Sequence, residues 1–220
     1  MKPFPTFYYN GLPFFDLVFI GQLIYTGRMK IIGGQFKGRN FFRPDGIRPM
    51  QSAVAKSLFD ILGQDMEGII FLDLFAGSGS VGIEALSRGA KHCTFVEKDA
   101  KCADTISKNL RHLDISAYSL IKADSFAAIK QIALQKQKYD IVFIDPPYAR
   151  ELGKKSLKTL EGYVILHASS TVVIKHDKYE ILPEEYGRFR LFRQKKYGST
   201  ALSFYQVKEA ENSSTGEGIE

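Results

Sequence analysis

Short apolar runs alternate with amphipathic segments along the middle of the chain. Their spacing predicts strands at 69–74, 93–97, 118–122 and 140–144 and helices at 81–88, 100–113 and 126–135. Strands that alternate with helices in this way form a parallel sheet with helices on both faces. The chain is therefore expected to be an α/β protein with a doubly wound, Rossmann-like sheet.

Further elements are predicted on both sides of this block. Gly33, Gly34 and Gly38 punctuate a β-hairpin over Met29–Phe42. Residues 54–62 have the apolar spacing of a helix, which is expected to cap the ligand pocket. After the block, we expect a helix at 152–160, a strand at 171–175 and a closing antiparallel pair at 188–192 and 201–207.

One domain is expected over residues 29–208. Residues 1–28 hold eight aromatic side chains and little charge, and they are predicted to lie outside that domain. The alternative is an apolar arm that packs on the domain or on a membrane. Residues 209–220 are rich in Glu, Ser and Gly and are expected to form a disordered tail.

The segment Ile141–Ala149 ends a buried strand in an acid, two prolines and an aromatic residue. Proline cannot donate to a sheet ladder, and it fixes the backbone as it leaves the strand. Asp145, Pro146, Pro147 and Tyr148 would present oxygen acceptors and a flat ring at the carboxyl end of a strand, where open α/β sheets bind ligands. This corner suits a planar base with an exocyclic amine. The alternative is a structural Pro-Pro turn with a surface tyrosine.

A second strand ends in an acid and a glycine-rich turn. Asp73 precedes Gly77-Ser78-Gly79, and the next predicted helix begins behind them. Glycine lets the backbone approach a ligand closely and adopt positive φ. The pattern is neither Gly-x-Gly-x-x-Gly nor a Walker sequence, and a carboxylate here suits a cationic or hydroxyl-bearing ligand. The alternative role for Asp73 is to cap the following helix.

Two further strands also end in acids. Glu97 occupies the usual place of the acid that binds ribose hydroxyls in doubly wound nucleotide sites. Asp124 is placed to reach an adenine edge, and it is equally suited to cap the next helix. For Glu97 the alternative is a solvated acid at the end of a strand.

In this order and spacing, the acids and the turn resemble those of S-adenosylmethionine-dependent amino-methyltransferases. The flanking segments Met29–Arg39 and Lys196–Tyr205 narrow the resemblance to the bacterial 16S ribosomal RNA guanine-N2 methyltransferase D family, over Met29–Lys208. The resemblance implies a class I methyltransferase fold and S-adenosyl-L-methionine as cofactor. It also implies methylation of the exocyclic N2 of a guanine in 16S rRNA, guanine 966 in that family.

The resemblance further implies roles for individual residues. Asp145, Pro146, Pro147 and Tyr148 would hold and activate the target base, with Tyr148 stacked on it. Glu97 would hold the ribose of the cofactor, and Asp124 its adenine amine. The implied cofactor-binding residues are Asp73, Phe75, Ala76, Gly77, Ser78, Gly79, Glu97, Lys98, Asp124 and Ser125.

Two places depart from the family pattern. Met50–Lys56 stands where the family usually has Thr-Thr-Asp-Arg or a close variant, near cofactor and substrate. Met50 itself is expected to lie in the core or to line the pocket. Lys175 stands where an acid is common at the end of a later strand.

Charge favours a polyanionic partner. The chain has 30 basic and 24 acidic residues, a net charge of +6 and a pI near 9.1. Arg188 and Arg190 belong to a run without an acid that extends to Lys196, and solvated basic residues at a sheet edge are the alternative interpretation. The partner implied is 16S rRNA in the small ribosomal subunit or an assembly intermediate. The expected RNA-binding residues are Lys37, Arg39, Arg43, Arg48, Arg193, Lys195 and Lys196.

Composition excludes several other classes. Cys93 and Cys102 are too few for a disulfide scaffold or a zinc site, and the four histidines lack metal-ligand spacing. No apolar run is long enough to cross a bilayer. A cytoplasmic monomer without a metal is expected. Two alternatives remain, an N6-adenine methyltransferase on DNA or RNA and a non-catalytic RNA-binding protein on the same fold.

Overall fold

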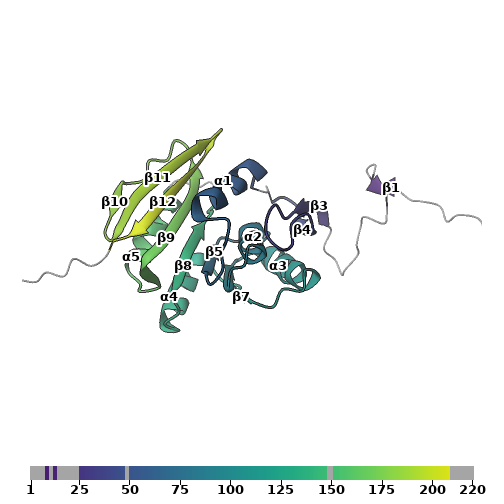
Figure 1. The fold of residues 1–220 in the computed structure, drawn as a ribbon, viewed down its shortest axis with the longest axis horizontal. Helices are drawn as coiled ribbons and strands as arrows, with labels where there is room; N and C mark the ends of the chain where they lie inside the picture. Colours follow the sequence, from purple (N-terminus) through teal and green to yellow (C-terminus); the bar gives the residue numbers. More distant parts are fainter. Residues whose placement is uncertain (1–7, 10–11, 14–24, 48–49, 148–150, 209–220) are drawn as a thin grey trace, which may run out of the picture.

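A computed structural model describes residues 8–9, 12–13, 25–47, 50–147 and 151–208 (Figure 1). Most of the expected N-terminal extension and all of the expected C-terminal tail lie outside these residues. Within the extension, the two-residue strands β1 (Tyr8–Tyr9) and β2 (Leu12–Pro13) pair with each other.

The centre of the fold is an eight-stranded sheet in the order β10-β11-β12-β9-β8-β5-β6-β7. The last five strands in this order are parallel, and β12, β11 and β10 extend the sheet antiparallel from β9. The predicted α/β fold and the closing antiparallel pair are confirmed. The strands are β5 (Ile70–Leu74), β6 (His92–Val96), β7 (Tyr118–Ile121), β8 (Tyr139–Ile144), β9 (Leu166–Asp177), β10 (Glu185–Tyr186), β11 (Phe189–Tyr197) and β12 (Thr200–Val207).

The helices of the described residues, α1 to α5, cover the sheet on its two faces (Figure 1). Leu58, Ile83 and Ile106 from the first three helices pack into one buried cluster, while Ile129 and Leu157 from the last two pack into the other. Each face of a parallel sheet is apolar and must be covered in this way. The helices are α1 (Ser52–Leu62), α2 (Ser80–Ser87), α3 (Ala100–His112), α4 (Ser125–Leu134) and α5 (Leu152–Glu161).

Strand β9 is longer than the sequence pattern predicts. Its register against β8 jumps between the pairs Tyr139–Leu166 and Ile141–Thr171. In the extra segment, the Ser170 hydroxyl donates to the Tyr139 carbonyl oxygen and accepts from the His167 amide. These polar, mostly exposed residues break the apolar pattern, so the sequence indicated only the second half of the strand.

The predicted β-hairpin is confirmed as the antiparallel pair β3 (Tyr25–Lys30) and β4 (Asn40–Pro44). It begins at Tyr25, before the expected boundary at Met29. Asn109 of α3 anchors β4, because its amide group accepts from the Phe42 N–H at 2.7 Å and donates to the Phe42 carbonyl oxygen at 2.9 Å. The hairpin is therefore fixed to the helical layer.

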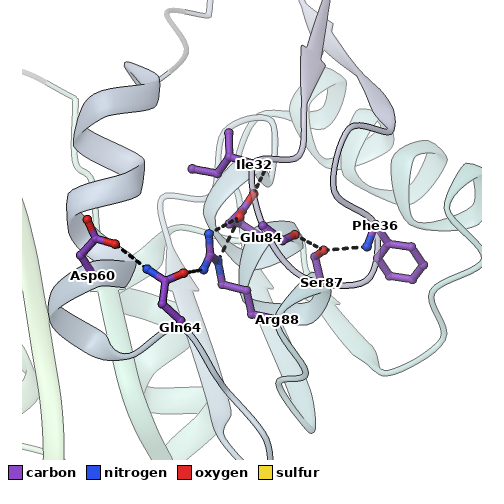
Figure 2. Close-up of polar contacts among 8 residues, drawn as sticks. Ile32, Phe36, Asp60, Gln64, Glu84, Ser87 and Arg88 are labelled. Atoms are coloured by element: carbon purple, nitrogen blue, oxygen red, sulfur yellow. Dashed lines mark hydrogen bonds and ion pairs between the residues drawn. The ribbon is translucent and has the colours of Figure 1, made fainter.

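A buried ion pair within α2 holds the loop between these two strands (Figure 2). The Arg88 guanidinium donates to Glu84 Oε1 at 2.8 and 3.0 Å, and the other Glu84 oxygen accepts from the Ile32 N–H at 2.9 Å. Arg88 also donates to Gln64 and lies over the Phe59 ring, 4.6 Å from its centroid. One helix thus connects the hairpin loop to the end of α1.

Glycine is required where this loop meets α2. The Gln35 N–H donates to the Ser87 carbonyl oxygen at 2.7 Å, and the Ser87 hydroxyl donates to the Gly33 carbonyl oxygen at 2.6 Å. Gly34 has a φ of +72°, and a Cβ there would lie 1.8 Å from the Ser87 carbonyl oxygen. A side chain at Gly34 is therefore incompatible with this contact.

No helix within the described residues has the length and apolar character needed to span a membrane.

We expect Arg88→Met to lower the free energy of unfolding by about 3–5 kcal/mol, because it leaves the Glu84 carboxylate buried without its partner. Both side chains of this pair are less than a tenth exposed. Urea denaturation measures the change. The matched control is Lys122→Met, which breaks a half-exposed pair with Asp104 and should cost about 1 kcal/mol or less. Equal losses in the two variants would contradict the anchoring role.

Candidate active site

The proline corner lies at the carboxyl end of β8, as predicted. The Asp145 N–H faces the Leu74 carbonyl oxygen of the neighbouring strand at 3.5 Å, and the Asp145 side chain is half-buried. Pro146 is buried and Pro147 is exposed. Tyr148 lies outside the described residues, so its stacking role stays a prediction.

The glycine-rich turn follows β5 directly and begins α2. Phe75, Gly77 and Gly79 have positive φ values of 62°, 56° and 77°. The Asp73 carboxyl group accepts from the Gly82 N–H at 3.0 Å, so it satisfies an amide in the first turn of α2. The capping alternative for Asp73 is thus observed, while its predicted contact with a cofactor stays a prediction.

Asp73 is enclosed by protein. Burial raises the pKa of Asp73 to about 8, the Gly82 amide opposes this rise, and the Asp145 and Glu97 carboxyl groups add to it. Asp73 is therefore harder to ionise than an exposed aspartate. The influence of Asp145 and Glu97 indicates that carboxyl groups from three neighbouring strands converge at this edge of the sheet.

Glu97 lies where β6 ends and faces the turn. Its side chain accepts from the Gly77 N–H at 2.7 Å and from the Asp99 N–H at 2.8 Å. These two bonds fix the carboxylate beside the glycine-rich backbone. A ribose hydroxyl could donate to the same oxygens, as predicted for a nucleoside ligand.

Asp124 caps α4. Its carboxylate accepts from the Phe126 N–H at 3.0 Å and the Ala127 N–H at 3.3 Å. This is the alternative that the sequence left open, and the predicted contact of Asp124 with an adenine amine stays a prediction. Ser125, the first residue of the helix, is buried.

A cavity of about 550 Å³ joins these strand ends. Ten of the predicted residues line it, whereas Asp73, Gly79 and Asp124 do not. Ser80 and the loop after β4 also contribute to the wall, and no residue of α1 does. The expectation that residues 54–62 cap this pocket was therefore wrong. The lining residues are Gly46, Ile47, Met50, Phe75, Ala76, Gly77, Ser78, Ser80, Glu97, Lys98, Ser125, Asp145, Pro146, Pro147 and Lys175.

Lys175 forms an ion pair with Asp145 that the sequence did not predict. Its Nζ lies 2.6 and 2.8 Å from the two carboxylate oxygens of Asp145, and its side chain is only 11% exposed. Burial raises the pKa of Asp145, and the charge and hydrogen bond of Lys175 oppose that rise. The sequence singled out Lys175 only because a lysine stands where the family commonly has an acid. It could not show that Lys175 contacts Asp145.

The basic run on β11 is divided between the two faces of the sheet. Lys175 and Lys195 both pair with Leu202 of β12, so their side chains share a face about 10 Å apart. Arg193 lies on the same face beside Phe204, whereas Lys196 pairs with Ala201 and points to the other face. Arg193 and Lys195 therefore form a basic surface on the same face of the sheet as Lys175, which lines the cavity.

Other predicted RNA-binding residues have structural partners. Arg39 donates to the carbonyl oxygens of His112 and Leu113 at the end of α3, and Arg43 donates to the Ile47 carbonyl oxygen. Lys37 is exposed on the hairpin loop, and Arg48 lies outside the described residues.

Two arginines of the predicted basic run lie at the start of β11, at the opposite end of the strand from Lys195 and Lys196. Arg188 donates to the Leu160 and Tyr163 carbonyl oxygens, and Arg190 lies 3.8 Å from Glu185. Both side chains therefore have partners within the protein, and a role for them in RNA binding stays a prediction.

Comparison with known proteins identifies relatives along most of the chain. The family model "Conserved hypothetical protein 95" matches residues 29–206. The "Putative rRNA methyltransferase YlbH" of Bacillus subtilis is 35% identical over 183 residues, which are 82% of this chain and 100% of that protein. The "Ribosomal RNA small subunit methyltransferase D" of Escherichia coli is 32% identical over 191 residues, covering 86% of this chain and 94% of that protein.

Solved structures agree with this result. The "Putative methyltransferase yhhF" of Escherichia coli superposes with a TM-score of 0.74 at 33% identity, covering 83% of this chain and 99% of that one. More distant methyltransferases of the same fold include two with bound S-adenosyl-L-homocysteine. The fold is therefore that of a class I methyltransferase, and the chain belongs to the ribosomal RNA small subunit methyltransferase D family.

Proposed function

We propose that this protein transfers a methyl group from S-adenosyl-L-methionine to the exocyclic amine of a base in ribosomal RNA of the small subunit. Family membership supports the cofactor and the class of RNA. The finer assignment is N2 of a guanine in 16S rRNA, guanine 966 by resemblance. The observation that carries the proposal is a single cavity lined by both the Asp145-Pro146 corner and the turn with Glu97.

The cofactor half of the cavity has the groups that a nucleoside with an amino-acid tail requires. The Gly77 backbone and Ser78 offer a close surface without bulky side chains, and the Glu97 carboxylate faces them. Phe75 contributes an aromatic wall, held edge-on against Phe126 with ring centroids 5.8 Å apart. S-adenosyl-L-methionine supplies an activated methyl group when bound, so no metal is needed for the transfer.

Asp145 and Pro146 make up the half of the cavity that would receive the base. The amine of guanine is a weak nucleophile because its lone pair is delocalised into the ring. Hydrogen bonds from this amine to the Asp145 carboxylate and the Pro146 carbonyl oxygen would direct the lone pair at the methyl carbon. Positioning of this kind in a dry site supplies most of the rate enhancement in a displacement reaction. A target base in structured RNA would have to flip out of its stack to enter.

The proposed function is tested by mass mapping of modified nucleosides in ribosomal RNA from cells with and without this gene. Loss of one N2-methylguanosine from 16S rRNA on deletion, restored by the purified protein and cofactor, is the expected result. Methylation of adenine in RNA or DNA would support the alternative activity instead. Unchanged nucleosides together with undetectable cofactor binding would favour a non-catalytic RNA-binding protein.

We expect Asp145→Asn to lower kcat by about 100-fold or more, because the amide cannot take the proton released by the amine. The affinity for S-adenosyl-L-methionine should stay within a few-fold of the wild type, since Glu97 and the glycine-rich turn are unchanged. Tritium transfer and calorimetry measure the two quantities. Asp104→Asn, at a half-exposed surface pair that does not line the cavity, is the control. Loss of cofactor binding alone would show that Asp145 has a different role.

A second expectation concerns RNA binding by the surface formed by Arg193 and Lys195. The double variant Arg193→Gln, Lys195→Gln should weaken binding to 16S rRNA and reduce the slope of log Kd against log salt by about 1.4–1.8, or 0.7–0.9 for each of two phosphate contacts. Lys130→Gln with Lys138→Gln removes the same charge from exposed positions in α4 and just before β8, and it is the control. An unchanged slope in the first variant would exclude this surface.

A further inference from the structure

The Lys175–Asp145 ion pair lies inside the cavity rather than at the protein surface. Lys175 reaches from β9 to the end of β8 and approaches both carboxylate oxygens, at 2.6 and 2.8 Å. Both residues line the cavity wall, and the lysine is the more enclosed partner, with 11% of its side chain exposed against 29% for Asp145. Burying two charges costs solvation free energy, and removing one partner would leave the other charge buried without compensation.

Several charged groups surround Asp145 in addition to Lys175. The pKa of Asp73, near the end of β5, is raised in part by Asp145 and Glu97, and both Glu97 and Lys98 line the same cavity as Asp145. Asp73 and Asp145 cannot both ionise cheaply, because burial favours the protonated form of each and the charge of Asp145 adds to the effect on Asp73. Lys175 contacts Asp145, so its positive charge favours ionisation of Asp145 over ionisation of Asp73.

The charge on Asp145 matters for the proposed chemistry. In the transfer, the amine nitrogen bonds to the methyl carbon while the carbon–sulfur bond breaks and its electron pair stays on sulfur. The nitrogen then carries a positive charge and releases a proton. An ionised Asp145 accepts hydrogen bonds from the amine and can receive that proton, whereas a protonated Asp145 is a weaker acceptor and already holds the proton that it would have to receive.

We propose that Lys175 is a positioning residue that keeps Asp145 ionised and holds its carboxylate in one orientation toward the target amine. This inference rests on the proposed methyltransferase function and adds the residue that controls its pH dependence. Lys175 itself does not contact the reacting atoms in this role. Because Lys175 contacts both carboxylate oxygens from a neighbouring strand, it restricts rotation of the Asp145 carboxylate.

The test compares pH profiles of kcat for the wild type and Lys175→Met, using small ribosomal subunits from cells that lack the gene. The active form of Asp145 is the ionised one, so activity falls as pH drops through its pKa. Without the ammonium group this acid limb should move upward by about 1–3 pH units. Lys175→Arg should restore the wild-type limb. Lys208→Met, which breaks an exposed pair with Glu185, is the matched control and should leave the profile unchanged.

A second measurement does not require turnover. Protein labelled with ¹³C at aspartate carboxyl groups reports Asp145 directly, once its signal is assigned by its absence in Asp145→Asn. This signal should titrate at a higher pH in Lys175→Met than in the wild type. An acid limb and a carboxyl titration at wild-type pH in a folded Lys175→Met protein would overturn the inference. A wild-type protein without methyl transfer to any RNA would instead overturn the proposed function, and the carboxyl titration would still decide the role of Lys175.

Discussion

The parallel register of β5, β8 and β9 is the constraint on which the site depends. Asp73 pairs with Phe143, and Phe143 with Val173, so the three strands run level with one another to their carboxyl ends. Side chains two residues apart share a face of the sheet. The same register therefore brings Asp145 and Lys175 together on the face that α1, α2 and α3 cover. A slip of one residue on either strand would turn one partner of this ion pair to the opposite face.

Helix α2 connects the carboxyl end of β5 to the N-terminal hairpin. Its first turn is fixed by the bond from Gly82 to Asp73, and its last turn holds the hairpin loop through Ser87 and the buried pair of Glu84 with Arg88. Because the loop after β4 supplies part of the cavity wall, the hairpin and the glycine-rich turn are positioned by the two ends of one helix. The geometry of the cavity thus depends on buried polar contacts that lie outside it.

Electrostatics give the cavity two distinct parts. Glu97 is bound to backbone amides beside the turn, whereas Asp145 is paired with a lysine at the proline corner. Backbone amides hold a carboxylate without adding a mobile charge, and a lysine holds it while neutralising it. The proposed cofactor carries a positive sulfur, so a site with carboxyl groups nearby and with the ammonium group of Lys175 paired to Asp145 is suited to receive it.

The sequence by itself determined the alternation of strands and helices in the parallel part of the sheet, the ends of β5, β6 and β8, and the residues of the Asp-Pro-Pro corner and the glycine-rich turn. These follow from local periodicity and from proline and glycine, whose effects act within a few residues. It did not determine that Asp73 and Asp124 bond to helix amides, that Arg188 folds back onto α5, or that Lys175 contacts Asp145. Those choices depend on which strands become neighbours and in what register. Only the tertiary structure decided them, because hydrogen-bond partners tens of residues apart are selected by packing and not by local pattern.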